Sequence, residues 1–201
     1  MSSDLKVTNL KHASSGSNNL VLASDGSATI ANATISAGTI GGGVTQGAYL
    51  NLTSMPSTQE AVITTSIPTT ARAIYIMFFG VSTSSSCDVI VQLGTSGGYK
   101  TSGYIGTRGY IGSSTTMEAS ADGFGIKNDI SADDSIYSLM DLVSFGSDNI
   151  WLAKTIGSYS GTNSYISSSQ GAVTLDGALT SLRARVSTGT FDAGKIAVYY
   201  K

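Results

Sequence analysis

The sequence is poor in the residue types that most catalytic and metal sites require. Its 201 residues include one cysteine and one histidine, and charged residues make up only 12%. A single cysteine excludes an intramolecular disulfide and a cysteine-based metal cluster. The single histidine, His12, lies near the N-terminus, so no Ser/His/Asp or Cys/His arrangement can form within one globular part of the chain. We therefore expect a protein that is not an enzyme and that has no metal and no cofactor.

The sequence also has no large excess of charge of one sign and no long apolar run. Both absences limit the classes of partner that the protein can bind. The net charge is −2, and no basic patch is present that would hold phosphates, so we expect no nucleic acid. The longest apolar run covers residues 73–81, whereas a membrane-spanning helix needs about 20 residues, so we expect no membrane. The N-terminus lacks the pattern of a secretory signal, and we expect synthesis in a cytoplasm.

The residues that dominate instead are those of an all-β protein. Serine, threonine and glycine account for 33, 23 and 24 positions, whereas only 2 residues are proline and 2 are glutamate. Apolar residues make up 41% and there are 10 tyrosines, which argues against simple disorder. This composition predicts strands joined by small polar turns.

The first 48 residues differ from the rest. Segments 20–22 and 28–30 flank Asp25-Gly26, which is a strong hairpin signal. A Thr-Ile pair then recurs every five residues, ending at Ile30, Ile35 and Ile40. Apolar residues are too sparse here to bury a core. Two interpretations stay open: a leader without its own fold, or a fibrous segment in which several chains bury isoleucines around a shared axis.

Residues 49–201 have a globular pattern. Gly/Ser/Asn/Asp turns separate seven apolar segments, which cover residues 73–79, 87–93, 136–145, 149–156, 172–175, 182–186 and 195–200. Such punctuation implies a β-sandwich or barrel, and we expect an antiparallel, jelly-roll-like β-sandwich after an extended N-terminal segment. Segment 73–79 is apolar on both faces, which predicts a central strand packed on two sides. Residues 95–134 form either an irregular edge hairpin or a long surface loop.

Few side chains are candidates for a site. Cys87 lies in a strand pattern and is expected to be a buried thiol. The carboxylates of residues 129–134 lack the spacing of a calcium loop, so a solvated turn is favoured over a cation site. Five tyrosines in Gly/Ser-rich turns are candidates for contact with a glycan or a protein, although covering the ends of a sandwich is an equally simple role: Tyr99, Tyr104, Tyr110, Tyr159 and Tyr165.

Two parts of the sequence resemble a known class of proteins. Residues 5–12, 14–22 and 25–27 are similar to the N-terminal segment of fibre-like virion proteins of marine tailed phages, especially cyanophages. Residues 74–82, 91–98, 102–104 and 190–200 are similar to a domain of phage and prophage fibre-type proteins. No catalytic motif comes with this resemblance.

The resemblance implies a homotrimer on the virion surface. Residues 1–48 would attach it to another virion protein of the capsid or tail, and residues 49–201 would form the outward-facing head. The residues expected at the attachment site or the trimer axis are apolar: Leu5, Val7, Leu10, Leu20, Leu22, Ile30, Ile35 and Ile40. The length suits a short fibre, knob or capsid-decoration protein. The alternative is a receptor-binding tail fibre head that binds host glycans, and a glycosidase is the least favoured class because no carboxylate spacing points to one.

Overall fold

A computed structural model describes residues 9–10, 20–22, 28–30, 48–64, 67–112, 115–145, 148–161 and 165–201. The chain divides into two units, Met1–Thr45 and Gln46–Lys201, and each is described by itself.

The described part of the first unit is a small antiparallel sheet. Its strands β1 (Asn9–Leu10), β2 (Leu20–Leu22) and β3 (Ala28–Ile30) pair in that order. The pairing of β2 with β3 confirms the predicted hairpin. Leu10, Leu20 and Ile30 are register partners across the three strands. Four of the predicted axis residues lie outside the described residues: Leu5, Val7, Ile35 and Ile40.

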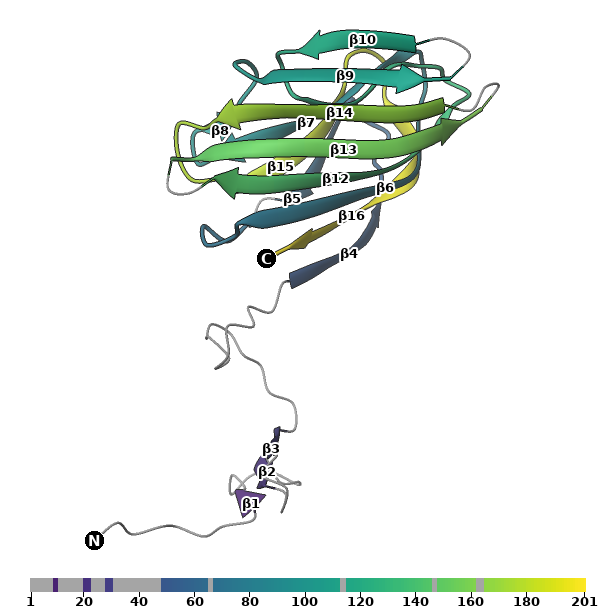
Figure 1. Cartoon of the computed structure of the whole chain (residues 1–201). Helices are drawn as coiled ribbons and strands as arrows, with labels where there is room; N and C mark the ends of the chain where they lie inside the picture. The colour runs from purple at the N-terminus through teal and green to yellow at the C-terminus, as the bar shows by residue number, and fades with distance from the viewer. Residues whose placement is uncertain are drawn as a thin grey trace, which may run out of the picture. The chain divides into compact units, whose positions relative to one another are not determined.

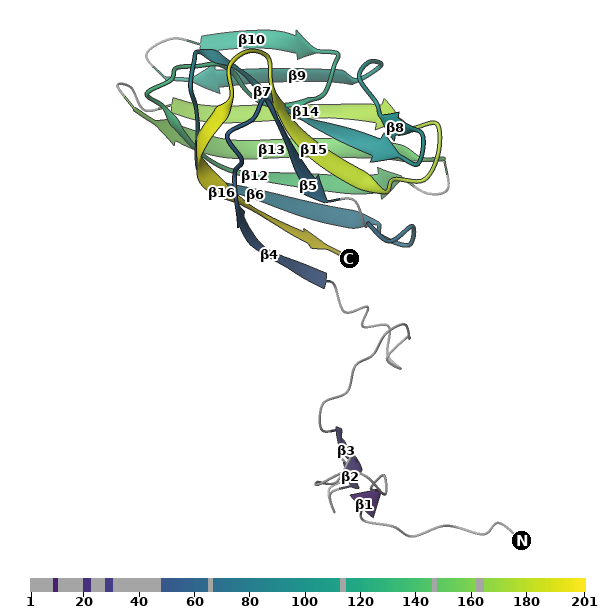
Figure 2. The same ribbon diagram turned by 180° about the vertical axis from the view of Figure 1, so that it is seen from behind.

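The second unit is all-β, and its strands form two antiparallel sheets that face each other (Figures 1 and 2). The large sheet has the order β10-β9-β14-β13-β12-β6-β16-β4, and the small sheet has the order β11-β7-β15-β5, with β8 paired to β7. In the large sheet the strands are β4 (Ala48–Ser54), β6 (Ala73–Thr83), β9 (Ile105–Ile111), β10 (Thr115–Ser120), β12 (Ser135–Phe145), β13 (Ile150–Ser160), β14 (Tyr165–Thr174) and β16 (Phe191–Tyr200). In the small sheet they are β5 (Glu60–Thr64), β7 (Cys87–Thr95), β8 (Gly98–Tyr99), β11 (Phe124–Ile130) and β15 (Ser181–Val186). The predicted antiparallel β-sandwich is confirmed.

The core lies between the two sheets. On β6 the even-numbered residues Ile74, Ile76 and Phe78 are buried, and on β7 Val89, Val91 and Leu93 face them from the small sheet. The alternation follows from the strand period of two, which sends every second side chain to the same face. Each such aliphatic or aromatic side chain contributes about 1.5–3 kcal/mol when it is fully buried.

The pairing of β16 with β6 contains a backbone irregularity. The register between these strands shifts on both sides of Ala193, and Gly194 has a φ of 97°. Opposite it, Gly80 has a φ of 61°. Side chains are strained in this left-handed region, and glycine removes the strain. The chain can therefore bend at this point while Phe191 stays fully buried and the rest of β16 continues to the C-terminus.

Two expectations need correction or completion. The prediction that residues 73–79 pack on two sides is wrong for the described residues, because only the face with Ile74 and Ile76 is covered while Phe79 on the other face is 62% exposed. Residues 95–134 contain an edge hairpin, β9 and β10, as one of the two interpretations held. They also contain β11, which crosses to the small sheet.

Candidate interaction surface

The side of the large sheet that faces away from the core is unusually apolar. We call it the outer face: the side chains of β6, β9, β10, β12, β13, β14 and β16 that alternate with the core residues. In the described part of the chain, every exposed large hydrophobic residue except Val62 lies on this face. Their exposed fractions run from 37% to 78%, and they are Tyr75, Phe79, Ile105, Ile111, Met117, Tyr137, Leu139, Val143, Phe145, Leu152, Ile156 and Ile166.

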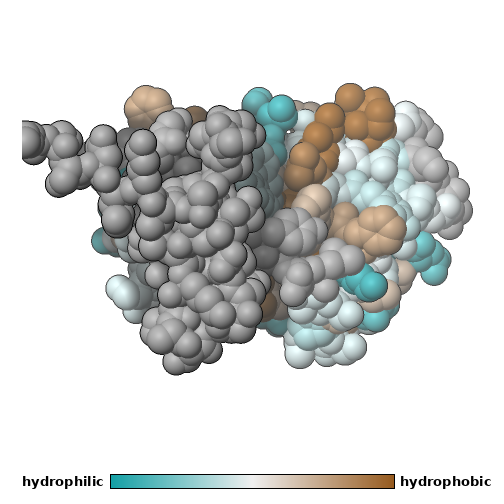
Figure 3. Space-filling view, turned by 90° about the horizontal axis from the view of Figure 1, so that it is seen from below, coloured by the Kyte–Doolittle hydropathy of each residue, from teal (hydrophilic) through white to brown (hydrophobic). Residues whose placement is uncertain are grey.

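Strand register arranges these residues in rows that run across the sheet. One row, which we call the apolar row, crosses seven strands without a charged residue and consists of Met117, Gly109, Ser168, Ile156, Leu139, Met77 and Ala197. Neighbouring strands are about 4.8 Å apart, so this row is about 30 Å long. Hydrophobic atoms also gather at one side of the described surface in Figure 3, next to paler polar residues.

The neighbouring row, which we call the polar row, consists entirely of side chains that can form hydrogen bonds. It consists of Thr107, Gln170, Lys154, Asp141, Tyr75 and Tyr199. Asp141 and Lys154 are register partners with opposite charges. The Oδ1 atom of Asp141 is buried and makes no hydrogen bond within the described residues. A partner from outside this part of the chain would satisfy it.

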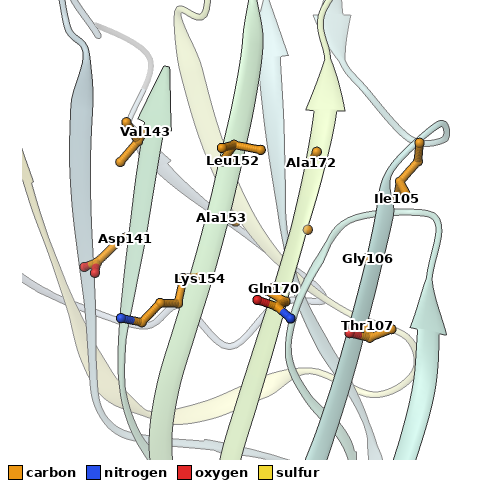
Figure 4. Close-up of a pocket in the computed structure, with 11 residues that line it drawn as sticks. Ile105, Gly106, Thr107, Asp141, Val143, Leu152, Ala153, Lys154, Gln170 and Ala172 are labelled. Carbon is orange, nitrogen blue, oxygen red and sulfur yellow. The ribbon is translucent and has the colours of Figure 1, made fainter. Parts of the chain in front are cut away.

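Two open hollows lie on the outer face. The larger, of about 800 Å³, extends between the polar row and the apolar side chains Ile105, Leu152 and Val143, over the small residues Gly171 and Ala172 (Figure 4). The smaller, of about 470 Å³, is lined by apolar residues of β6, β12, β13 and β16: Met77, Phe79, Leu139, Ile156 and Ala197 among them. The outer face therefore offers shape as well as apolar area to a partner.

Tyr104 is a core residue, so the prediction that it lies in a turn open to a ligand is wrong. Its side chain is 4% exposed and packs edge-on against Phe124, with ring centroids 5.0 Å apart. The backbone N–H of Leu93 donates to its hydroxyl over 2.9 Å, and the hydroxyl donates to the Lys100 carbonyl over 3.2 Å. Burial raises the pKa of Tyr104 to about 12.

This gives a test by alkaline titration. The pKa of Tyr104 is about 12 in the folded chain against an ordinary 10.0, so the folded state keeps a proton that the unfolded state loses. Stability should therefore fall as the pH rises from about 10 to about 12. Tyr104→Phe should remove this part of the pH dependence, and should cost about 1–3 kcal/mol at neutral pH because the Leu93 N–H loses its acceptor. Urea unfolding of both proteins at several pH values measures the two effects.

Three of the other predicted tyrosines come together. Tyr110, Tyr159 and Tyr165 form a ring cluster, with Tyr110–Tyr165 and Tyr159–Tyr165 centroids 5.1 Å apart. Tyr159 is 1% exposed, so the prediction of a turn tyrosine is wrong for it as well. Tyr110 and Tyr165 are half-buried, and their contact with a ligand stays a prediction.

Tyr99 lies apart from that cluster, on β8. It is half-buried, and the Arg183 guanidinium carbon lies 4.4 Å from the centre of its ring. A cation held over the ring face occupies the surface that a sugar would use. Contact between Tyr99 and a ligand stays a prediction.

Several ionisable side chains in the described part of the chain pair with opposite charges. The pairs include Lys127–Asp134 at 2.9 Å, Arg108–Asp88 at 2.6 Å and Arg183–Glu60 at 2.7 Å. Within the described residues no group of three or more His, Cys, Asp or Glu side chains is placed to hold a metal ion. Cys87 is buried as expected, and this burial raises the pKa of its thiol. His12 lies outside the described residues.

We did not predict the outer face from the sequence, although the sequence contains the hydrophobic pattern that indicates it. The two-faced apolar pattern of residues 73–79 and the alternation of Tyr137, Leu139 and Val143 with core residues are visible in the sequence. We interpreted the first as burial by a second layer. The part of the chain that the structure describes supplies this layer on one side only.

Comparison with known proteins identified no relative of the chain. No protein-family model, no curated protein and no solved structure matches the chain. Across the ranges that the structure describes, no helix has the length and hydrophobicity to cross a membrane.

Proposed function

We propose that the chain is a non-catalytic surface protein of a tailed-phage virion, either a short fibre or knob or a capsid-decoration protein. It acts as a homotrimer that residues 1–48 attach to another virion protein, while the sandwich is displayed outwards. The observation that carries this proposal is the outer face of the large sheet. A sheet face that gathers twelve exposed large hydrophobic residues and few charges is suited to contact rather than to chemistry.

The small sheet of strands β1, β2 and β3 supports the attachment role. Its strands have 2, 3 and 3 residues, which is too little to form an independently stable unit. Leu10, Leu20 and Ile30 share one register row. A row of this kind gains stability when another protein or further copies of the chain cover it. The resemblance of this segment to phage fibre leaders motivates the choice of a virion protein as the partner.

Labelling of intact particles tests the proposal. A gold-labelled antibody against residues 49–201 should bind particles of the phage that encodes the chain. Label over the capsid would support decoration, and label on the tail would support a fibre. Absence of label from every particle would contradict the proposal. Leu20→Asp, in the register row, should abolish attachment, whereas Thr29→Asp at the alternate register position serves as the control.

A receptor-binding tail fibre head is the second candidate. It is favoured by Tyr110 and Tyr165, whose half-buried rings lie 5.1 Å apart at neighbouring strand ends of the large sheet. Aromatic rings stack on the apolar faces of sugars and their hydroxyls bond to sugar hydroxyls. Binding on a glycan array that Tyr165→Ala abolishes would support this function, and a blank array at high protein concentration would contradict it.

A further inference from the structure

We propose that the outer face of the large sheet packs against a second copy of the chain. The sandwiches are then held together directly, and not by residues 1–48 alone. This inference rests on the proposed function in one respect, namely that the chain works as a homo-oligomer. It names the surface through which the copies meet.

The first argument is the composition of the two central strands. Strands that read as continuous hydrophobic runs are usually buried on both faces. On β6, Tyr75, Met77 and Phe79 alternate with the core residues, and on β12 Leu139 and Val143 do the same. Phe79 is 62% exposed and Val143 is 49% exposed. Their sequence suits a second covering layer that the described part of the chain does not provide.

The second argument concerns solubility. The net charge is −2 over 201 residues, so electrostatic repulsion between chains is weak. A monomer that presents an apolar face of this size with so little charge would associate without specificity. A second copy of the chain is the one partner that is always present in equal amount wherever the protein is made. Self-association would therefore remove the face from water from the time of synthesis.

The third argument is area. The apolar row spans seven strands at a spacing of about 4.8 Å, and four parallel rows about 6.7 Å apart cover the strands lengthwise. The outer face therefore measures about 30 Å by about 20 Å, which is on the order of 600 Å². A specific interface of ordinary size buries about 600–1,000 Å² on each partner. The face is thus large enough for a stable contact between copies.

The fourth argument is charge. When the outer faces of the copies converge on the axis of a trimer, a cluster of charges of one sign would bring like charges together. Asp141 and Lys154 in the polar row are opposite in sign and adjacent in register, and Lys195 adds one positive charge on β16, at the register position of Phe79. The unsatisfied Oδ1 of Asp141 is available to a donor of the second copy, for which its Lys154 is chemically suited.

Accessibility of single thiols in the full-length chain tests the inference. Ile156 and Val62 are 55% and 60% exposed, so cysteines at the two positions would react alike in an isolated sandwich. Ile156 lies in the apolar row, whereas Val62 lies on β5 of the small sheet. The native Cys87 is buried and gives a low background. We expect Ile156→Cys to react with a bulky maleimide at least tenfold more slowly than Val62→Cys, and the difference to vanish in urea.

Sedimentation velocity of charge variants gives a second readout. Leu139→Glu places a carboxylate in the centre of the apolar row and should convert the wild-type oligomer to smaller species, with an unchanged far-UV spectrum. Val62→Glu is the matched control and should sediment like the wild type. Equal maleimide rates at positions 156 and 62 would overturn the inference even if Leu139→Glu fails to fold. A monomeric wild-type chain at micromolar concentration would also overturn it. Equal maleimide rates would leave the proposed function standing if the antibody still labels particles, whereas a monomeric chain would also contradict the homotrimer of the proposed function.

Discussion

Replacing Asp134 by alanine should lower the free energy of unfolding by about 3–5 kcal/mol, because it removes the carboxylate that lies against a buried ammonium group. The side chains of Lys127 and Asp134 are 2% and 7% exposed, and the ammonium nitrogen lies 2.9 Å from Asp134 Oδ2. The same oxygen accepts the Ser131 N–H over 3.2 Å, and Lys127 Nζ lies 3.5 Å from the centre of the Tyr159 ring. Urea unfolding followed by tryptophan fluorescence measures the loss.

The neighbouring carboxylate supplies the control for this prediction. Asp133 is exposed, so Asp133→Ala should change stability by less than about 0.5 kcal/mol. Replacing the pair together, as Lys127→Met with Asp134→Leu, should recover most of the loss, because an apolar pair of similar volume removes both buried charges. If Asp134→Ala and Asp133→Ala were equally mild, the buried pair would not have the role assigned to it.

The second large effect is expected at Gly194. A Cβ atom built there would lie 2.6 Å from the carbonyl carbon of Gly80 and closer still to the Cα of Val81. Both neighbours are backbone atoms of β6, so neither can move aside cheaply. The positive φ of 97° adds strain for any other residue. Gly194→Val should therefore cost about 3–5 kcal/mol, from overpacking and strain together.

Substitutions at two other glycines separate the effect of backbone strain on stability from the effect of overpacking. Gly98 has a φ of 114° but nothing within 4 Å of a Cβ, so Gly98→Ala tests backbone strain alone and should cost about 1–2 kcal/mol. Gly97 has neither restriction, with Thr95 Oγ1 as its nearest atom at 3.6 Å, and Gly97→Ala should be close to neutral. Thermal melts of the three variants rank them. A Gly194→Val protein as stable as Gly97→Ala would show that the bulge between β16 and β6 is not as described.

The sequence was sufficient to predict the secondary structure in segments where the local residue pattern and the packing in the folded chain agree. Residues 20–30 carry a turn signal between two short apolar runs, and the hairpin forms there. Segments 87–93 and 182–186 have apolar residues at alternate positions, and both are strands. In 182–186 the period of two predicts which side chains are buried, whereas in 87–93 Ile90 and Gln92 on the other face are buried as well.

The sequence was not sufficient where pairing partners come from far along the chain. Strand β9 contains two glycines and an arginine, which disfavour a strand locally, yet it pairs with β14 some 60 residues later. The tyrosines near glycines suggested turns, but glycine there makes room for a ring. A Cβ on Gly112 would overlap the ring of Tyr165. Asp134 was assigned to a solvated turn because its partner Lys127 could not be foreseen from spacing.

Cryo-electron microscopy of the purified full-length chain tests the central claim most directly, namely that this is an assembly protein that works through the outer face of its large sheet. We expect particles with three copies in which strands β6, β12 and β13 of each sandwich are covered by a neighbouring copy. Density that shows single sandwiches, or an oligomer in which these strands face solvent, would contradict the account.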